Sequence, residues 1–227
     1  MKILDVPQSG STAGTTSSRN RFGQYRRTRA IPVNPNTAAQ TDVRAGFSQW
    51  SQAWKGLGQA ARDAWIAYAA AHPRLDALGQ SIVLTGLQYY VGVQTLLQLV
   101  GAGANPYPPG YSSVLNAPVI SVDEDSIAGP PAIAFTPTPI PANQAMIVYS
   151  SPPRTKGVSF NRDFRYLLAA PAAEASPLDI GTELTTKWGT LLPGQRFFLR
   201  AKAIWTGTSD AGLVSTESNI ITLDLVA

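Results

Sequence analysis

The sequence is organised around residues 19–73, which begin with Arg19-Asn20-Arg21-Phe22-Gly23-Gln24-Tyr25-Arg26-Arg27-Thr28-Arg29. This basic segment closes with Pro32-Val33-Asn34-Pro35-Asn36-Thr37, and two predicted helices rich in tryptophan follow it. Five arginines fall between positions 19 and 29, so positive charge is concentrated at the front of the chain. No catalytic motif accompanies the stretch. It indicates an anchoring arm on a folded body, and function has to be argued from that architecture.

Composition bounds the class of protein. The 227 residues are 44% hydrophobic and 14% charged, which predicts a hydrophobic core. The 19 glycines and 18 prolines favour long arms and β-turns. Because the chain has no cysteine, disulfides and zinc–cysteine sites are excluded. The N-terminus lacks the apolar run of a signal peptide, and no stretch reaches the roughly 18 apolar residues of a membrane span. We therefore expect a soluble protein, made in the host cytoplasm, with no membrane partner.

Residues 1–36 are predicted to form an extended basic N-terminal arm. Residues 7–18 are rich in Ser, Thr and Gly, a composition typical of flexible linkers that cannot bury a core. We expect this arm to make few contacts with its own chain and many with other subunits.

Residues 37–104 are predicted to form a small three-helix domain. Thr37 and Gln40 have the spacing of a capping box at the start of the first helix, and Thr85 and Gln88 repeat that spacing at the third. Pro73 ends the second helix, which runs from about residue 59 to 71. The first helix carries five large apolar residues on one face, namely Val43, Phe47, Trp50, Trp54 and Leu57.

The hydrophobic period changes from helical to strand-like after a proline-rich linker at residues 105–116. Short apolar runs separated by Pro- and Gly-rich turns then predict a β-sandwich over residues 117–227. The predicted strands are 119–122, 132–136, 145–150, 165–169, 196–205 and 218–225. The expected fold class is thus a multidomain α+β protein.

The second half of the chain resembles a fibronectin type III domain. The resemblance lies mainly in Leu192-Pro-Gly-Gln-Arg-Phe-Phe-Leu-Arg-Ala-Lys-Ala-Ile204, where a Pro-Gly turn precedes an aromatic residue and alternating core positions. Phe197 or Phe198 stands where this family usually has tyrosine, and Phe135 replaces its early tryptophan. The resemblance implies a fibronectin III or immunoglobulin-like sandwich and names no ligand.

The first half resembles a recurrent group of bacterial and prophage-encoded proteins of virion type. The matching residues are Arg19-Asn20-Arg21-Phe22-Gly23 with Tyr25, Pro32-Val33-Asn34-Pro35 with Thr37 and Gln40, Ser51-x-x-Trp54-x-x-Leu57 and Arg62-x-x-Trp65. Together with the β-sandwich, this resemblance implies a phage virion component. It supplies no site residues.

The arm holds the candidate partner-interface residues, which are Arg19, Arg21, Phe22, Tyr25, Arg26, Arg27 and Arg29. Arginines interleaved with aromatics could bind nucleic acid through phosphates and stacking. They could equally lie over a protein surface with the aromatics as anchors, and the modest net charge of +4 favours the protein partner. Trp50, Trp54 and Trp65 fit a helical core and are also possible interface aromatics.

The remaining polar residues predict no chemistry. The single histidine, His72, stands at a helix end, where a capping role suffices. Asp123-Glu124-Asp125 has the composition of a cation-binding loop but is more typical of a solvated one. We therefore predict no catalytic, cofactor-binding or metal-binding residues, no cofactor and no enzymatic activity.

The function expected is a structural component of a phage virion, such as a capsid decoration or cement protein or a minor capsid protein. The arm and helices would anchor it, with the sandwich facing outward, and its location would be the virion. Its partners would be major capsid or tail subunits and copies of itself. The alternatives are a tail, baseplate or host-surface adhesion protein and, less favoured, a nucleic-acid-binding protein that uses the arm.

Overall fold

The computed structural model describes residues 8–20, 23–76, 78–110, 115–122, 131–207 and 210–225. It is a mixed α and β protein whose chain divides into two compact units, residues 1–43 and 44–227. None of the described helices is long and apolar enough to cross a membrane.

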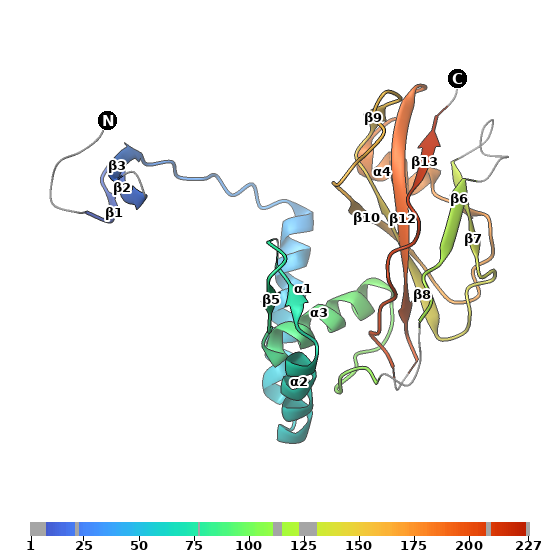
Figure 1. Ribbon diagram of the computed structural model, residues 1–227, viewed down its shortest axis with the longest axis horizontal. Coiled ribbons are helices and arrows are strands. Elements are labelled where there is room, and N and C mark those ends of the chain that lie inside the picture. The colour runs from blue at the N-terminus through green and yellow to red at the C-terminus, as the bar shows by residue number, and fades with distance from the viewer. Residues whose placement is uncertain are drawn as a thin grey trace. The chain divides into compact units, whose positions relative to one another are not determined.

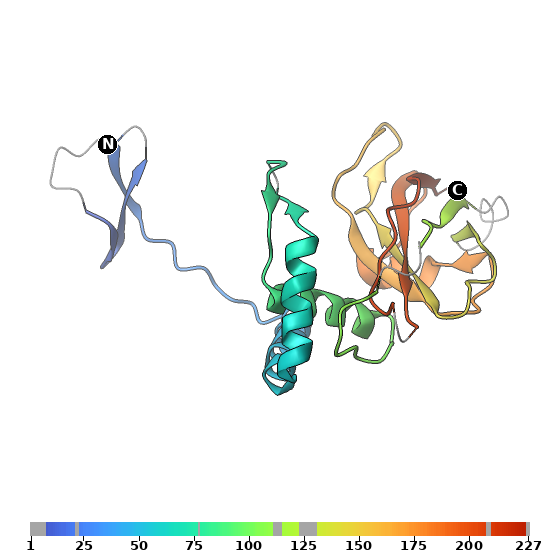
Figure 2. The same ribbon diagram turned by 60° about the horizontal axis from the view of Figure 1, so that its bottom comes forward.

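The N-terminal unit contains a small antiparallel sheet where the sequence predicted an extended arm. Its strands are β1 (Gly10–Thr12), β2 (Thr15–Asn20) and β3 (Gly23–Thr28), paired in chain order (Figure 2, blue). The threonines in β1 and β2 favour strands because they are β-branched. The prediction gave more weight to the high Ser, Thr and Gly content, which is typical of linkers. Residues 29–37 then follow with no helix or strand. The predicted extended arm is therefore wrong for residues 10–20 and 23–28, which form this sheet.

Three predicted helices are confirmed as α1 (Ala38–Gly56), α2 (Gln59–Ala71) and α3 (Gly86–Leu99) (Figure 1). The Thr85 hydroxyl accepts a hydrogen bond from the Gln88 backbone N–H, and the Gln88 side chain accepts one from the Thr85 N–H, so the capping box at α3 is complete. At α1, Thr37 Oγ1 accepts a hydrogen bond from the Gln40 N–H at 3.3 Å.

A short hairpin replaces the linker expected between α2 and α3. Its strands are β4 (Arg74–Leu75) and β5 (Ser81–Ile82). Asp76 organises the turn because its Oδ1 accepts hydrogen bonds from the N–H groups of Leu78 and Gln80, each at 2.8 Å.

Two antiparallel sheets form the framework of the described residues between 117 and 225. One has the order β11-β7-β6, and the other has the order β10-β8-β12-β13, with β9 pairing on β12. The six strands predicted from the sequence are all present. Two short strands, β9 and β11, and the helix α4 were not predicted. The elements are β6 (Val119–Val122), β7 (Ala132–Thr136), β8 (Gln144–Ser150), β9 (Arg154–Thr155), β10 (Arg165–Ala170), β11 (Leu178–Asp179), α4 (Gly181–Trp188), β12 (Gln195–Trp205) and β13 (Ile221–Asp224). We call this part of the chain the two-sheet body.

The first core lies between the two sheets. Strands of both contribute buried side chains to it, including Phe135 of β7 and Phe197 of β12, and Leu184 of α4 joins them. Alternation along β8 turns Met146 and Val148 toward this core.

A second core lies on the opposite face of β8. Ala145 and Ile147 of β8 and Ile204 of β12 pack there against Trp65 of α2 and several residues of α3. Both faces of β8 are therefore buried, which explains why Ala145-Met146-Ile147-Val148 is a continuous apolar run.

This second core changes the predicted domain division. Residues 105–116 were expected to separate two domains, whereas the structure has helices α2 and α3 and the two-sheet body in one compact unit. The segment after α3 is fixed rather than free. Gln94, fully buried on α3, exchanges hydrogen bonds with the backbone of Asn105, whose side chain in turn donates one to the Ala211 carbonyl at 3.3 Å.

Candidate interaction surfaces

The described arm arginines are spread over both faces of the N-terminal sheet. Arg19 pairs with Gln24, and Tyr25 pairs with Ser18 on the neighbouring strand. Because side chains alternate along a strand, Arg19 and Arg26 share one face while Tyr25 and Arg27 share the other. All four arginines here, Arg29 included, are exposed, and Tyr25 is half-buried. Arg21 and Phe22 lie outside the described residues.

The N-terminal sheet has no core of its own. None of its described side chains is buried, and its strands carry mostly Ser, Thr, Gln and Arg. A small sheet needs a hydrophobic face, or packing against another element, to be stable in water. The described side chains of this sheet do not supply such a face.

Helix α1 exposes the N-terminal half of its apolar face. Val43 is 73% exposed and Phe47 is 61% exposed, whereas Trp50 and Trp54, further along the same face, are half-buried. Trp50 Nε1 donates a hydrogen bond to Gln98 Oε1 at 2.8 Å, and the Trp54 ring packs on Tyr90 at 5.5 Å between centroids. The part of the helix face that carries Val43 and Phe47 therefore lacks the cover that α3 gives to Trp50 and Trp54.

The hairpin β4–β5 and the residue after it add further exposed apolar side chains, namely Leu75, Leu78, Ile82 and Val83. Exposed apolar side chains that lie together mark interaction sites more often than scattered single residues do.

Trp65 is a core residue and cannot be an interface aromatic. It is fully buried, and its Nε1 donates a hydrogen bond to the Pro106 carbonyl at 2.9 Å. Its ring meets Tyr90 edge-on at 5.5 Å. The interface interpretation is thus wrong for Trp65 and stays a prediction for Trp50 and Trp54, which keep part of their surface in solvent.

His72 occupies the C-cap of α2. Its Nδ1 lies 2.7 Å from the Tyr68 carbonyl, and its ring lies 4.4 Å from the Tyr68 ring. Among the residues that the structure describes, no group of His, Asp and Glu side chains is arranged to hold a metal ion. The acidic run Asp123-Glu124-Asp125 lies outside them.

A cluster of aromatic rings and cations lies on the two-sheet body. The rings belong to Tyr149, Phe164, Tyr166 and Trp188, all half-buried. The cations are Arg165, Lys187 and Arg200, each within 6 Å of at least one of these ring centroids. We call these seven residues the cation–aromatic surface. Burial raises the pKa of Tyr149 and of Tyr166 above the ordinary value, so both phenols stay protonated and can donate hydrogen bonds.

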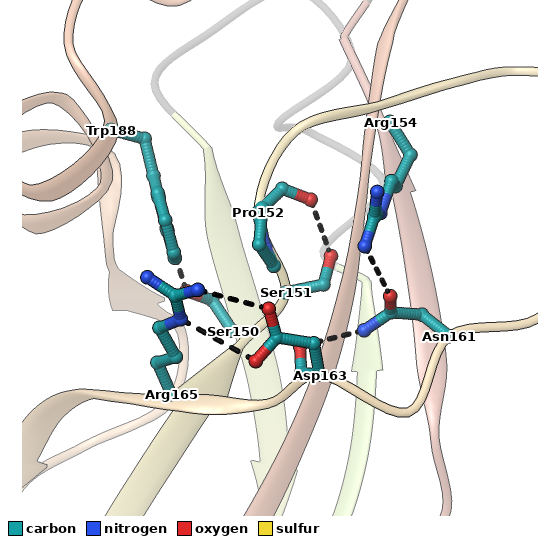
Figure 3. A network of polar contacts seen from close by, with 8 residues as sticks. All are labelled: Ser150, Ser151, Pro152, Arg154, Asn161, Asp163, Arg165 and Trp188. Carbon is teal, nitrogen blue, oxygen red and sulfur yellow. Dashed lines mark hydrogen bonds and ion pairs between the residues drawn. The ribbon is translucent and has the colours of Figure 1, made fainter. Parts of the chain in front are cut away.

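One end of this surface is fixed by a hydrogen-bonded network (Figure 3). Trp188 Nε1 donates to the hydroxyl of the fully buried Ser150 at 2.9 Å. Arg165 Nη2 forms an ion pair with Asp163 Oδ2 at 3.1 Å, and its guanidinium lies 5.4 Å from the centroid of the Trp188 ring. Behind them, Asn161 donates to the Asp163 carbonyl and accepts from Arg154.

The cation–aromatic surface was not predicted from the sequence, because its aromatic residues do not form an obvious cluster along the chain. Its members come from β8, β10, α4 and β12 and from the residue before β10, and they lie up to 51 positions apart in the chain. The local signal was the run Phe164-Arg165-Tyr166, in which two aromatic residues flank a cation.

The chain matches no model of a known protein family, and no curated protein is similar to it.

Proposed function

We propose that the chain is a structural component of a phage virion, a capsid decoration or cement protein or a minor capsid protein. Its N-terminal sheet and helices attach to major capsid or tail subunits and to copies of itself, and the two-sheet body faces outward. The observation that carries the proposal is the N-terminal sheet, which is folded yet has no buried described side chain. Such an element needs a further surface to pack on, and in this proposal a partner subunit supplies it.

The exposed face of α1 supports the same proposal. Val43 and Phe47 lie on the same apolar helix face as the half-buried Trp54, but their own side chains are exposed to solvent. Covering two such side chains at an interface contributes about 1.5–3 kcal/mol each. An assembly that repeats the contact by symmetry multiplies this gain.

The two-sheet body is, in this proposal, a sandwich of fibronectin III type. The chain pairs β6 with β7, crosses to the second sheet for β8 and β10, returns for β11 and crosses again for β12 and β13. Crossing between antiparallel sheets in this way is the Greek-key connectivity of immunoglobulin-like and fibronectin III-type sandwiches. Such modules serve as spacers and display platforms, and the fold alone names no ligand.

Nucleic-acid binding through the arm is less well supported. The described arginines divide between the two faces of a small sheet, so they do not form one basic track along which a phosphate backbone could lie. A tail, baseplate or host-surface adhesion protein is the second candidate, and the cation–aromatic surface favours it because rings beside cations are typical of recognition sites.

Deletion of residues 1–30 tests the anchoring role. We expect the deletion variant to be lost from purified particles while its two-sheet body still folds. Among point variants, Tyr25→Ala should reduce incorporation at least as much as any single change of Arg26, Arg27 or Arg29 to Ala. The reason is that a buried interface aromatic contributes about 2–4 kcal/mol, against about 0–1 kcal/mol for an exposed ion pair.

Salt provides the control for this ranking. If the triple arginine variant and high salt both strip the protein from particles while Tyr25→Ala stays bound, charge governs attachment and the arm binds a polyanion instead. Normal incorporation of the deletion variant would refute anchoring by this segment.

A further inference from the structure

We propose that the cation–aromatic surface binds a sugar that carries a carboxylate, with the carboxylate beside Lys187 and the sugar ring against Trp188. This binding activity belongs to the two-sheet body and goes beyond the proposed structural role. It does not depend on whether the chain is anchored in a virion.

Lys187 is a cation whose neighbours are rings and another cation. Its Nζ lies 5.9 Å from the centroid of Tyr166 and 5.6 Å from that of Trp188. Among the described residues, no carboxylate forms an ion pair with it. Burial, together with the positive charge of Arg165, lowers the pKa of Lys187 below its ordinary value. A half-buried ammonium group beside a second cation is stabilised by an anion, and the nearby carboxylate of Asp163 is engaged by Arg165 instead.

Trp188 and Arg165 are held in place before any ligand arrives (Figure 3). The indole is tied to the buried Ser150, and the guanidinium is tied to Asp163, which Asn161 supports from behind. Fixing side chains in advance reduces the entropy lost on binding, which is how small ligands are held at shallow sites. A surface needed only for solubility would gain nothing from such a network.

The mixture of charges favours a sugar over a polyanion. Asp163 lies beside Arg165, and Glu217 accepts ion pairs from Arg200 and Lys202, so carboxylates interrupt the positive surface. A nucleic-acid backbone needs an unbroken basic track and would meet these carboxylates. A carboxylated sugar needs one cationic point, an apolar ring face for the indole and hydroxyl partners such as the tyrosine phenols. An acidic peptide offers the charge without the ring.

The test is an NMR titration of the full chain, following the indole N–H signal that Trp188→Phe removes. The probes are N-acetylneuraminic acid and glucuronic acid, with glucose as the neutral control. We expect the acidic sugars to shift the Trp188 signal in a saturable way and glucose to leave it unchanged. Lys187→Gln should weaken binding about tenfold, the usual effect of losing a charge-assisted contact. The matched control Lys202→Gln should change it less than about twofold, because Lys202 is paired with Glu217.

Several outcomes would overturn the proposal. They are equal binding of glucose, an effect of Lys202→Gln as large as that of Lys187→Gln, or no saturable shift with either acidic sugar. Saturable binding of a glutamate-rich peptide or a single-stranded oligonucleotide in place of the sugars would likewise reject it in favour of that ligand. Lys187 is half-buried and forms no ion pair with a described carboxylate, so its variant is expected to fold, and an amide spectrum that matches the unmodified chain away from position 187 would confirm that. Failure here leaves the anchoring proposal untouched, because deletion of residues 1–30 tests separate residues.

Discussion

Substituting Gly212 by Ala tests whether the helices and the two-sheet body share one core. Gly212 follows β12 and has a φ of +97°, a conformation that residues with a side chain rarely adopt. A Cβ at this position would lie well inside van der Waals contact distance of Val93 Cγ1 on α3. The substitution therefore introduces backbone strain and, separately, a clash across the boundary between helix and sheet.

The two costs can be estimated separately. Holding a non-glycine residue at such a φ costs about 1–3 kcal/mol. Forcing an extra methyl group into a packed interface costs about 1–3 kcal/mol more. Gly212→Ala should thus lower the free energy of unfolding by about 2–6 kcal/mol. Gly194→Ala is the matched control and should cost only the strain, since Gly194 has a φ of +83° but nothing within 4 Å of the place that a Cβ would occupy.

Urea unfolding of these variants and of the double variant Gly212→Ala/Val93→Ala measures the clash directly. Val93→Ala alone should cost about 2 kcal/mol through lost burial. In the double variant the clash is relieved, so the two single effects should exceed the combined effect by about 1–3 kcal/mol. If Gly212→Ala costs no more than Gly194→Ala, or if the two changes are additive, α3 does not pack on the loop after β12 and the shared core is refuted.

Two further predictions concern the two-sheet body. Arg196 donates hydrogen bonds to both carboxylate oxygens of Asp224, at 2.6 and 2.7 Å, and these bonds hold the pKa of Asp224 below its ordinary value. The pKa of Asp224 is lower in the folded state than in the unfolded state, so its ionised form stabilises the fold at pH 7, and Asp224→Asn should lower the melting temperature there. The difference in melting temperature between the variant and the unmodified protein should disappear as the pH falls below about 4. A difference that persists at pH 3 would contradict this. A fragment of residues 111–227 should fold into a β-rich, cooperative unit, as measured by circular dichroism. It should also self-associate in size-exclusion chromatography, because removing the helices exposes Ile147 and Ile204. An unfolded fragment would show that the sheets depend on the helices.

The helices could be predicted from the sequence because their signals are local. Apolar residues at steps of three and four, Thr85 with Gln88 as a capping box, and Pro73 as a terminator each act within a few residues. The same holds for six strands with clear apolar runs. Helix α4 was missed because it is short and polar, with Leu184 as its one buried side chain among eight residues.

The small hairpins escaped prediction for the opposite reason. Strands β1 to β3 contain no buried described side chain, so no apolar alternation marks them, and a Ser/Thr-rich segment resembles a linker. Strands β4 and β5 have two residues each, too few for any period, and the Asp76 turn that joins them depends on hydrogen bonds seen only in three dimensions.

The domain boundary and the cation–aromatic surface share a cause that lies in strand β8. Residues 145–148 are apolar at every position, and a strand covered on one face only would alternate apolar with polar side chains. The run therefore required a third layer over the outer face, and α2 and α3 supply it through Trp65 and its neighbours. Beyond residue 148 the pattern changes to Tyr149-Ser150, and the outer face passes from helix-covered to partly exposed. Tyr149 packs at the border of the helical core and also lies 5.5 Å from the guanidinium of Arg200. The point at which the helices stop covering the sheet is thus the point at which the half-buried rings and the cations beside them begin, so a single change in the β8 sequence marks both the end of the shared core and the start of the cation–aromatic surface.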